Sequence, residues 1–175
     1  VLPLMAEAMG MKLVTVDSSG TEEDDLKALS QVLSGLEVEG VVTGAIASDY
    51  QWDRINHVCE GLDLRVFSPL WRKDQGMLMD ELLDSGIKTL LVSVSADGLE
   101  TSWLGKEIDA AMLETLRKVA LRRGMNLAGE GGEYETTVLD SPLHTMSMRI
   151  LESETHTVRD GGSLKIKKAI LEVKT

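Results

Sequence analysis

Eight consecutive residues, Gly129 to Thr136, combine three glycines with three carboxylates. Glycine lets backbone N–H groups approach a ligand closely and adopt positive φ angles. The carboxylates of Glu130, Glu133 and Glu135 could hold a metal ion, accept a hydrogen bond from an amine or orient a base edge. The same pattern is also typical of an acidic, flexible turn between a helix and a β-hairpin. From the local pattern alone, both interpretations stay open.

A second group of polar residues follows the short apolar run Gly40–Gly44. Ser48 stands three residues before Gln51, which is the spacing of a capping box at the start of a helix. We therefore expect a strand, a glycine loop and a capped helix, the order in which α/β folds bind ligands at the carboxyl ends of strands. Ser48, Asp49 and Gln51 can meet such a ligand, or they can simply cap the helix.

The composition is that of a soluble globular chain. Its 175 residues, 43% apolar and 27% charged, allow one domain with a substantial core and a small appendage. The net charge of −11 argues against direct nucleic-acid binding. The single cysteine, Cys59, excludes an internal disulfide and suits a reducing cytoplasm. No apolar run approaches the ~20 residues of a membrane helix, so we expect a cytoplasmic protein that does not bind membranes.

Strand-like and helix-like segments alternate along the first two thirds of the chain. The expected strands are Lys12–Val16, Gly40–Gly44, Leu64–Phe67 and Ile87–Val94. The expected helices are residues 1–9, Glu22–Ser34, residues 48–60, Asp74–Ser85, and a last one from Lys106 or Glu107 to Gly124. This alternation predicts an α/β fold with a mostly parallel sheet.

The character of the sequence changes in its last third. Residues 143–175 alternate apolar and polar side chains on either side of a turn signal at Arg159–Ser163. We read this part as an antiparallel β appendage. We therefore divide the chain into a domain of residues 1–124 and a C-terminal subdomain of residues 125–175, which carries the glycine–glutamate motif and β-hairpins.

Four segments, taken in order, form a specific combination, although any one of them would be a weak signal. They are Val41–Gln51, Ser68–Trp71, Ser102–Gly105 and Gly129–Thr136. The chain resembles the diphthine–ammonia ligase family in these segments, archaeal members most closely. This is a PP-loop ATP-binding family of the adenine nucleotide alpha hydrolase-like group. The likeness covers essentially the whole chain.

The resemblance implies a fold and an activity. The expected fold is a HUP-like α/β domain, a mostly parallel sheet with helices on both faces, followed by a smaller mixed or antiparallel β subdomain. The implied enzyme uses ATP and Mg²⁺ to adenylate the carboxylate of diphthine, a modified histidine on translation elongation factor 2. Ammonia, present as ammonium, then displaces AMP and gives diphthamide. A homodimer is included among the expected assemblies.

The resemblance also implies roles for individual residues. The nucleotide is expected at Thr43, Gly44, Ala45 and Ser48. The substrate is expected at Asp49, Tyr50, Gln51, Trp71, Trp103, Gly131, Gly132, Tyr134 and Thr136. The quaternary ammonium of diphthine favours aromatic faces, for which Trp71, Trp103 and Tyr134 are candidates. The catalytic candidates are Glu130, Glu133 and Glu135, which could bind this cation or help ammonium lose its proton. The metal ligands are left unassigned.

One departure from the family pattern leaves other functions open. The Ser-Gly-Gly-Lys-Asp-Ser loop expected to hold the ATP pyrophosphate does not occur in the 175 residues. With the helical start at Val1, this suggests that upstream sequence is missing and that the fragment alone is inactive. One alternative is a PP-loop enzyme that adenylates another acceptor, such as a tRNA base. Another is a non-catalytic nucleotide- or metabolite-binding module.

Overall fold

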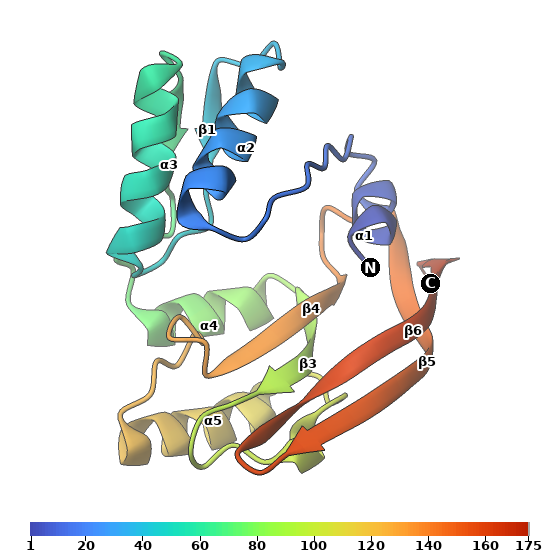
Figure 1. Cartoon of the computed structure of the whole chain (residues 1–175). Helices are drawn as coiled ribbons and strands as arrows, with labels where there is room; N and C mark the ends of the chain where they lie inside the picture. Colours follow the sequence, from blue (N-terminus) through green and yellow to red (C-terminus); the bar gives the residue numbers. More distant parts are fainter. Residues whose placement is uncertain (175) are drawn as a thin grey trace. The chain divides into compact units, whose positions relative to one another are not determined.

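The computed structural model describes residues 1–174, and the chain forms two compact units (Figure 1). One unit is Val14–Lys73. The other combines Val1–Leu13 with the described chain from Asp74 onward. The chain therefore leaves the second unit after Leu13 and returns to it at Asp74. The division predicted between residues 124 and 125 stays a prediction.

The unit Val14–Lys73 is built from two helices and a short parallel sheet. In chain order these elements are α2 (Glu22–Ser34), β1 (Gly40–Val42), α3 (Asp49–Gly61) and β2 (Arg65–Phe67). The hydroxyl of Thr21 caps α2 by accepting a hydrogen bond from the Asp24 N–H, and the acidic first turn suits the helix dipole. β1 pairs with β2 in parallel, with Val41 opposite Val66. The helix α3 links the two strands, so β1, α3 and β2 form a β-α-β unit.

The second unit contains a four-stranded antiparallel sheet in the order β4-β3-β6-β5. Its strands are β3 (Lys88–Val94), β4 (Tyr134–Asp140), β5 (Met146–Val158) and β6 (Gly161–Val173). Its helices are α1 (Leu2–Ala8), α4 (Gln75–Asp84), a short 3₁₀ turn η1 (Thr101–Trp103) and α5 (Ala110–Arg123). The long β5–β6 hairpin pairs with β3 through the residues next to its turn, where Val94 lies opposite Gly162.

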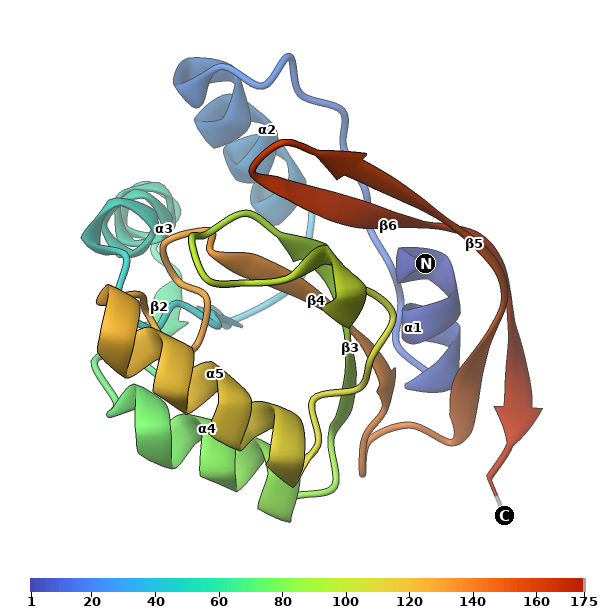
Figure 2. The same ribbon diagram turned by 90° about the horizontal axis from the view of Figure 1, so that it is seen from below.

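Helices α4 and α5 lie side by side against β3 and β4 (Figure 2). Arg117 of α5 ties them together by an ion pair of 2.6 Å with Asp80 of α4. Between the helices and the strands lies a core of buried side chains: Met79, Leu91, Val94, Trp103, Ile108, Leu113, Leu116, Val119 and Tyr134. This core fixes the strand ends and helix ends from which the loops of the candidate site emerge.

The α/β character and most of the expected elements are confirmed, but the mostly parallel sheet is wrong. The parallel sheet has two strands, and β3, expected to extend it, pairs antiparallel with β4 and β6. A continuous apolar strand indicates burial, and burial alone does not fix the direction of the neighbouring strands. The antiparallel β5–β6 hairpin, with its turn at Arg159–Asp160, agrees with the expected C-terminal β appendage.

Two local predictions are also wrong. Lys12–Val16 forms no strand, and these residues are exposed, since β-branched side chains make a strand only where a partner strand exists. The last long helix begins at Ala110, and Asp109 caps it by accepting from the Met112 N–H at 2.8 Å. The residues before it pair instead with β3, where the Leu91 N–H donates to the Lys106 carbonyl.

Candidate functional site

The glycine–glutamate loop, defined as residues 129–133, lies between the end of α5 and the start of β4. Gly129 and Gly132 have φ angles of +76° and +78°, which favour glycine. A Cβ at Gly129 would stand 2.9 Å from the Tyr134 carbonyl oxygen, so the backbone passes too close for any side chain. The predicted glycine-dependent loop is therefore a compact turn with a specific shape.

Glu133 turns its carboxylate back onto this loop. Oε1 accepts hydrogen bonds from the Asn126 backbone N–H at 2.7 Å and from Asn126 Nδ2 at 2.9 Å. Oε2 accepts from the Gly131 N–H at 2.7 Å. Burial alone would raise the pKa of Glu133, but these donors outweigh it and hold that pKa below its usual value. The carboxylate is therefore a fixed anion at neutral pH.

Two further residues hold the loop in place. The Gln75 side chain, at the start of α4, donates to Asn126 Oδ1 at 3.2 Å and accepts from the Ala128 N–H at 2.9 Å. The Ser95 hydroxyl, just after β3, donates to the Gly132 carbonyl at 2.5 Å. The Ser95 N–H donates to the Glu133 carbonyl at 2.8 Å. The loop is thus attached to a helix and a strand of the core.

The other predicted residues of this motif lie in different surroundings. Tyr134 is 5% exposed, and its hydroxyl donates to the Leu127 carbonyl at 2.5 Å. Burial, and after it the charge of Glu133, raises the Tyr134 pKa. Glu130 is half-buried, whereas Glu135 and Thr136 are exposed on β4. The three carboxylates are close together in the sequence, but the structure gives each of them a different environment.

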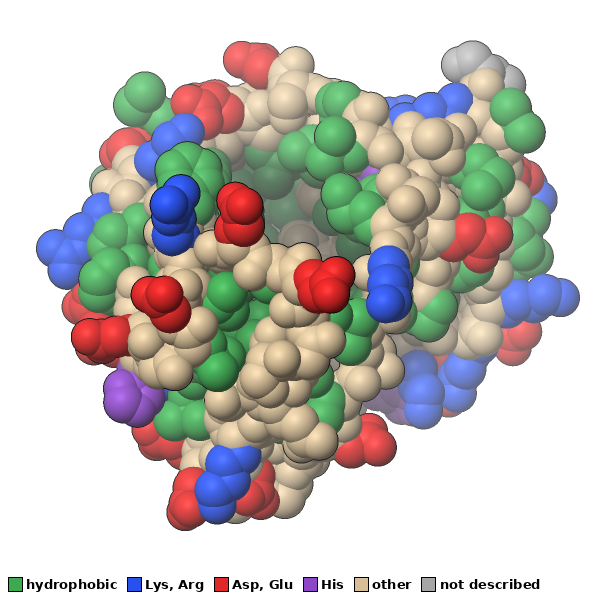
Figure 3. Space-filling view, turned by 90° about the horizontal axis from the view of Figure 1, so that it is seen from above, with side chains coloured by type: hydrophobic (Ala, Val, Ile, Leu, Met, Phe, Trp, Pro, Cys, Tyr) green, Lys and Arg blue, Asp and Glu red, His purple; other side chains and the backbone are tan. Residues whose placement is uncertain are grey.

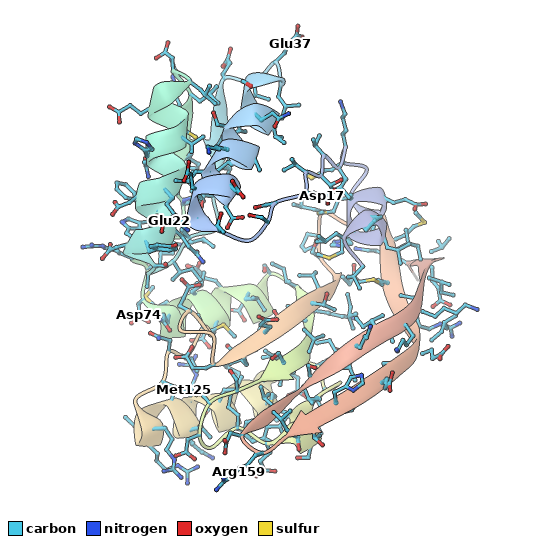
Figure 4. All side chains as sticks on the ribbon, in the orientation of Figure 1. Asp17, Glu22, Glu37, Asp74, Met125 and Arg159 are labelled. Carbon is cyan, nitrogen blue, oxygen red and sulfur yellow. The ribbon has the colours of Figure 1, made fainter. Side chains whose placement is uncertain are left out.

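A cleft of about 710 Å³ lies beside this loop within the same unit. One wall is the segment from Ser95 to Thr101, and the other is the hairpin tip from Thr157 to Gly161. Arg159, labelled in Figure 4, lies at that tip. Since Ser95 lines the cleft and also bonds the glycine–glutamate loop, the cleft and the loop share one residue.

The predicted nucleotide residues surround the carboxyl end of β1 in the unit Val14–Lys73. Thr43 is buried, and its hydroxyl accepts from the Ala45 N–H at 3.1 Å. The Ser48 hydroxyl accepts from the Gln51 N–H at 3.3 Å and caps α3, as the capping box predicts. Gly44 is exposed, and a Cβ there would meet nothing within 4 Å. Gly44 thus leaves open space above the end of the strand.

The segment after β2 packs against the same end of α3. Trp71 stacks on Trp52, and the Arg72 N–H donates to the Ile46 carbonyl at 2.7 Å. The Arg72 guanidinium pairs with Asp49 at 3.0 Å, although both side chains are about 70% exposed. A surface pair of this kind adds little stability, but it places a cation beside the start of α3.

Tyr50 belongs to a separate cluster between α2 and α3. Its ring lies under the Arg54 guanidinium, at 3.7 Å from the ring centroid. Both Arg54 and the Tyr50 hydroxyl reach Glu22, at 2.8 Å and 3.3 Å. Figure 4 shows Glu22 at the start of α2, on the side facing α3. Hydrogen bonding to Arg54 lowers the Glu22 pKa. This cluster joins the two helices, and Gln51 is exposed next to it.

Trp103 lies in the core of the other unit at 8% exposure, which leaves little surface for a ligand. The sequence did not single out Gln75, Asn126 or Ser95. Gln75 bonds Asn126 and Ala128, and Ser95 bonds Gly132, across 37 to 53 positions. Only the position of Gln75 directly after the helix cap Asp74 offered a local signal. The site predictions themselves stay predictions.

Acidic side chains are interspersed with basic ones on the face in Figure 3. Within residues 1–174, no group of three or more His, Cys, Asp or Glu side chains is arranged to hold a metal ion. None of the helices in that range is long and apolar enough to cross a membrane.

The chain matches known protein families along most of its length. It is an α/β protein whose two parts match two family models in succession. The diphthamide synthase N-terminal domain matches residues 1–66, and the diphthamide synthase C-terminal domain matches residues 74–172. The chain therefore belongs to the diphthamide synthase family.

Individual relatives agree with this placement. A zebrafish (Danio rerio) protein named diphthine–ammonia ligase is 39% identical over 168 residues, which cover 87% of this chain and 66% of the relative. The human protein of that name is 36% identical over 87% of this chain and 63% of its own length. The one from Schizosaccharomyces pombe is 35% identical over 97% of this chain but 29% of its own length. The chain thus spans less than two thirds of each of these relatives.

Proposed function

We propose that this chain is part of an ATP-dependent ligase that converts diphthine on elongation factor 2 to diphthamide with ammonia. The observation that carries the proposal is the succession of two diphthamide synthase domains along residues 1–66 and 74–172. The relatives described above all carry the name of this ligase. This favours it over an adenylating enzyme with another acceptor and over a binding module.

The reaction requires the diphthine carboxylate to attack the α-phosphorus of ATP, which forms an acyl-adenylate and releases pyrophosphate. Ammonia then attacks the acyl carbon and AMP leaves. We assign the adenine and ribose to the end of β1, because Gly44 leaves open space there. The hydroxyls of Thr43 and Ser48 accept hydrogen bonds from backbone N–H groups, and each keeps its own O–H as a donor.

The diphthine cation and ammonium are assigned to the carboxylates of the second unit. A quaternary ammonium offers no N–H donor and is held by charge and aromatic faces. Glu130 and Glu135 are the residues proposed to meet these cations. Mg²⁺ would neutralise phosphate charge during adenylation. Its ligands in this chain stay unassigned, since within residues 1–174 no group of three or more His, Cys, Asp or Glu side chains is arranged to hold a metal ion.

The proposal also includes the fold, the cellular location and the assembly. The HUP-like fold is supported by the β-α-β unit formed by β1, α3 and β2. We also propose a cytoplasmic location and leave a homodimer as an expected assembly. The acidic net charge of −11 agrees with a cationic substrate group and with the absence of a nucleic-acid partner from the proposal.

The test is AMP release from the full-length protein with ATP, ammonium and diphthine-bearing elongation factor 2, each omitted in turn. AMP is expected only when all three are present. Glu130→Gln and Glu135→Gln are expected to lower the rate, while Glu60→Gln, an exposed position on α3, serves as the matched control. If AMP is released when another acceptor takes the place of the elongation factor, that acceptor is the substrate and the proposed one is wrong. Nucleotide binding without any AMP release would favour a binding module.

A further inference from the structure

Glu133 is bound by its own loop in a way that does not suit a proton-transfer residue. A carboxylate has about four positions for accepting hydrogen bonds. Three donors from Asn126 and Gly131 occupy Glu133, at 2.7 to 2.9 Å. A general base must direct a lone pair at the substrate and exchange protons near neutral pH. Glu133 is instead oriented inward and held as an anion by the same donors.

The contacts continue from Glu133 to a core helix. Asn126 donates to Glu133 through Nδ2 and accepts from Gln75 through Oδ1. Gln75 accepts in turn from the Ala128 N–H. Gln75 is the first residue of α4, which contributes Met79 to the buried core. Figure 4 labels Asp74 and Met125, the sequence neighbours of Gln75 and Asn126, at the same end of α4 and α5.

We infer that Gln75, Asn126 and Glu133 form a positioning relay that fixes the glycine–glutamate loop to α4, and that Glu133 transfers no proton in the reaction. The relay holds Glu130 and the Gly131–Gly132 backbone in one conformation for the substrate. This role rests on the proposed function. It assigns to Gln75 and Asn126 a part that neither the motif nor the family match describes.

The glycines explain why a relay is required. A loop with positive φ at both Gly129 and Gly132 loses much conformational entropy when it is ordered. Hydrogen bonds to α4, which packs on the core through Met79, offset that loss, since side chains of a rigid element hold a site more precisely than the loop itself can. A Cβ at Gly131 would stand 2.8 Å from Glu133 Oε1, so the carboxylate also fills the space beside this glycine.

Three variants break the relay at different points. Gln75→Ala removes the link to α4. Asn126→Asp keeps the size of the side chain but sets a second carboxylate against Glu133. Glu133→Gln keeps the shape but loses the charge. Gln31→Ala, an exposed glutamine on α2, is the matched control.

Two readouts on the full-length protein separate positioning from chemistry. Hydrogen exchange at the Asn126 and Gly131 amides is expected to accelerate by at least ~10-fold in each relay variant, because their acceptor is lost or displaced. The β3 amides of Leu91 and Val94 should keep their protection, which shows that the core remains folded. In the AMP-release assay kcat is expected to fall roughly 10- to 100-fold, with KM for ATP unchanged. Gln75→Ala combined with Glu133→Gln should be no slower than the slower single variant.

Two results would overturn the inference. Loss of kcat in Glu133→Gln, with both amides still protected as in the wild type, would make Glu133 a direct participant in the chemistry. Unchanged exchange and unchanged kcat in Gln75→Ala would show that no relay exists. If the wild-type protein releases no AMP, the proposed function fails, and the exchange data alone decide whether the relay holds the loop.

Discussion

The indole of Trp71 stacks on that of Trp52, with ring centroids 5.4 Å apart and 19° between the ring planes. Trp52 belongs to the first turn of α3, and Trp71 to the segment that follows β2. The stack therefore joins the segment after β2 to the helix that follows β1. Both segments border the end of β1 where we place the nucleotide.

Replacing Trp71 should loosen this corner. Trp71→Ala removes the stack and the apolar area that it buries, and is expected to lower the stability of the unit Val14–Lys73 by about 2 kcal/mol. Trp71→Phe retains an aromatic face and should cost less than about 1 kcal/mol. Urea unfolding followed by far-UV circular dichroism measures both. Equal losses in the two variants would show that ring stacking contributes nothing specific.

Gly129 and Gly132 provide a matched pair in the glycine–glutamate loop. Both have positive φ, but only Gly129 would place a Cβ against the backbone, 2.9 Å from the Tyr134 carbonyl oxygen. Gly132→Ala should cost about 1 kcal/mol for the strained backbone alone. Gly129→Ala should cost at least about 2 kcal/mol, because the steric clash adds to that strain. Thermal unfolding of the two variants tests the order, and a reversed order would contradict the loop geometry.

Local patterns predicted the elements whose caps lie close in sequence. Ser48 with Gln51 gave the start of α3, and α2 runs over the expected Glu22–Ser34. The strand expected at Lys12–Val16 does not form, because β-propensity acts only where a second strand is present. The direction of β3 could not be read from its apolar residues, since its partners β4 and β6 come 40 or more residues later in the chain.

The geometry of the glycine–glutamate loop was partly predictable from the sequence, whereas the site residues and their roles stay predictions. The motif itself indicated glycines in unusual conformations, and Gly129 and Gly132 have them. It could not indicate that Glu133 would face inward, because that depends on Asn126. The segment Ser102–Gly105 could not indicate that Trp103 lies in the core, since its aromatic side chain is equally consistent with packing or with ligand contact.

The Tyr134 hydroxyl predicts an alkaline limit to stability. Burial raises the Tyr134 pKa above its ordinary value of 10.0. The folded state therefore retains the proton more strongly than the unfolded state, and its contribution is lost as the pH rises above about 10. Tyr134→Phe should cost about 1–2 kcal/mol at neutral pH through the lost bond to Leu127, and should remove this alkaline dependence. Unfolding between pH 8 and 11 tests both, with Tyr50→Phe as an exposed control.

The environment of Asp140 predicts a loss of stability at low pH. Burial alone would raise its pKa, but the hydrogen bond and charge of Lys174, 2.6 Å away, together with the Ser141 N–H, lower it below 3.8. The stabilisation is therefore present above about pH 4 and is lost as the pH falls through the lowered pKa. Asp140→Asn should cost about 1–2 kcal/mol at pH 7 and less below pH 4. Asp160→Asn, at the exposed hairpin turn, should show neither effect in the same denaturant titrations.

Gly161 controls how the long hairpin joins the rest of its sheet. A Cβ there would lie 2.3 Å from the Val94 carbonyl oxygen, which the backbone cannot accommodate without moving. Gly161→Ala is expected to cost about 3 kcal/mol and to increase hydrogen exchange where β3 meets β6. Gly61→Ala, where a Cβ meets nothing within 4 Å, should be neutral or stabilising by up to about 1 kcal/mol. Normal exchange at Val94 in Gly161→Ala would contradict the close approach.

Residues 14–73 are inserted into the unit that holds α1, and this constrains the order of folding during synthesis. The Ala8 carbonyl of α1 accepts hydrogen bonds from the N–H and hydroxyl of Thr145, 137 residues later. The ribosome must therefore deliver α5 and β4 before α1 finds its partner. Residues 14–73 are synthesised much earlier. If they fold first, they shorten the loop that must close, since closure entropy grows with the length of flexible chain. Until then the apolar residues of α1 are available to chaperones.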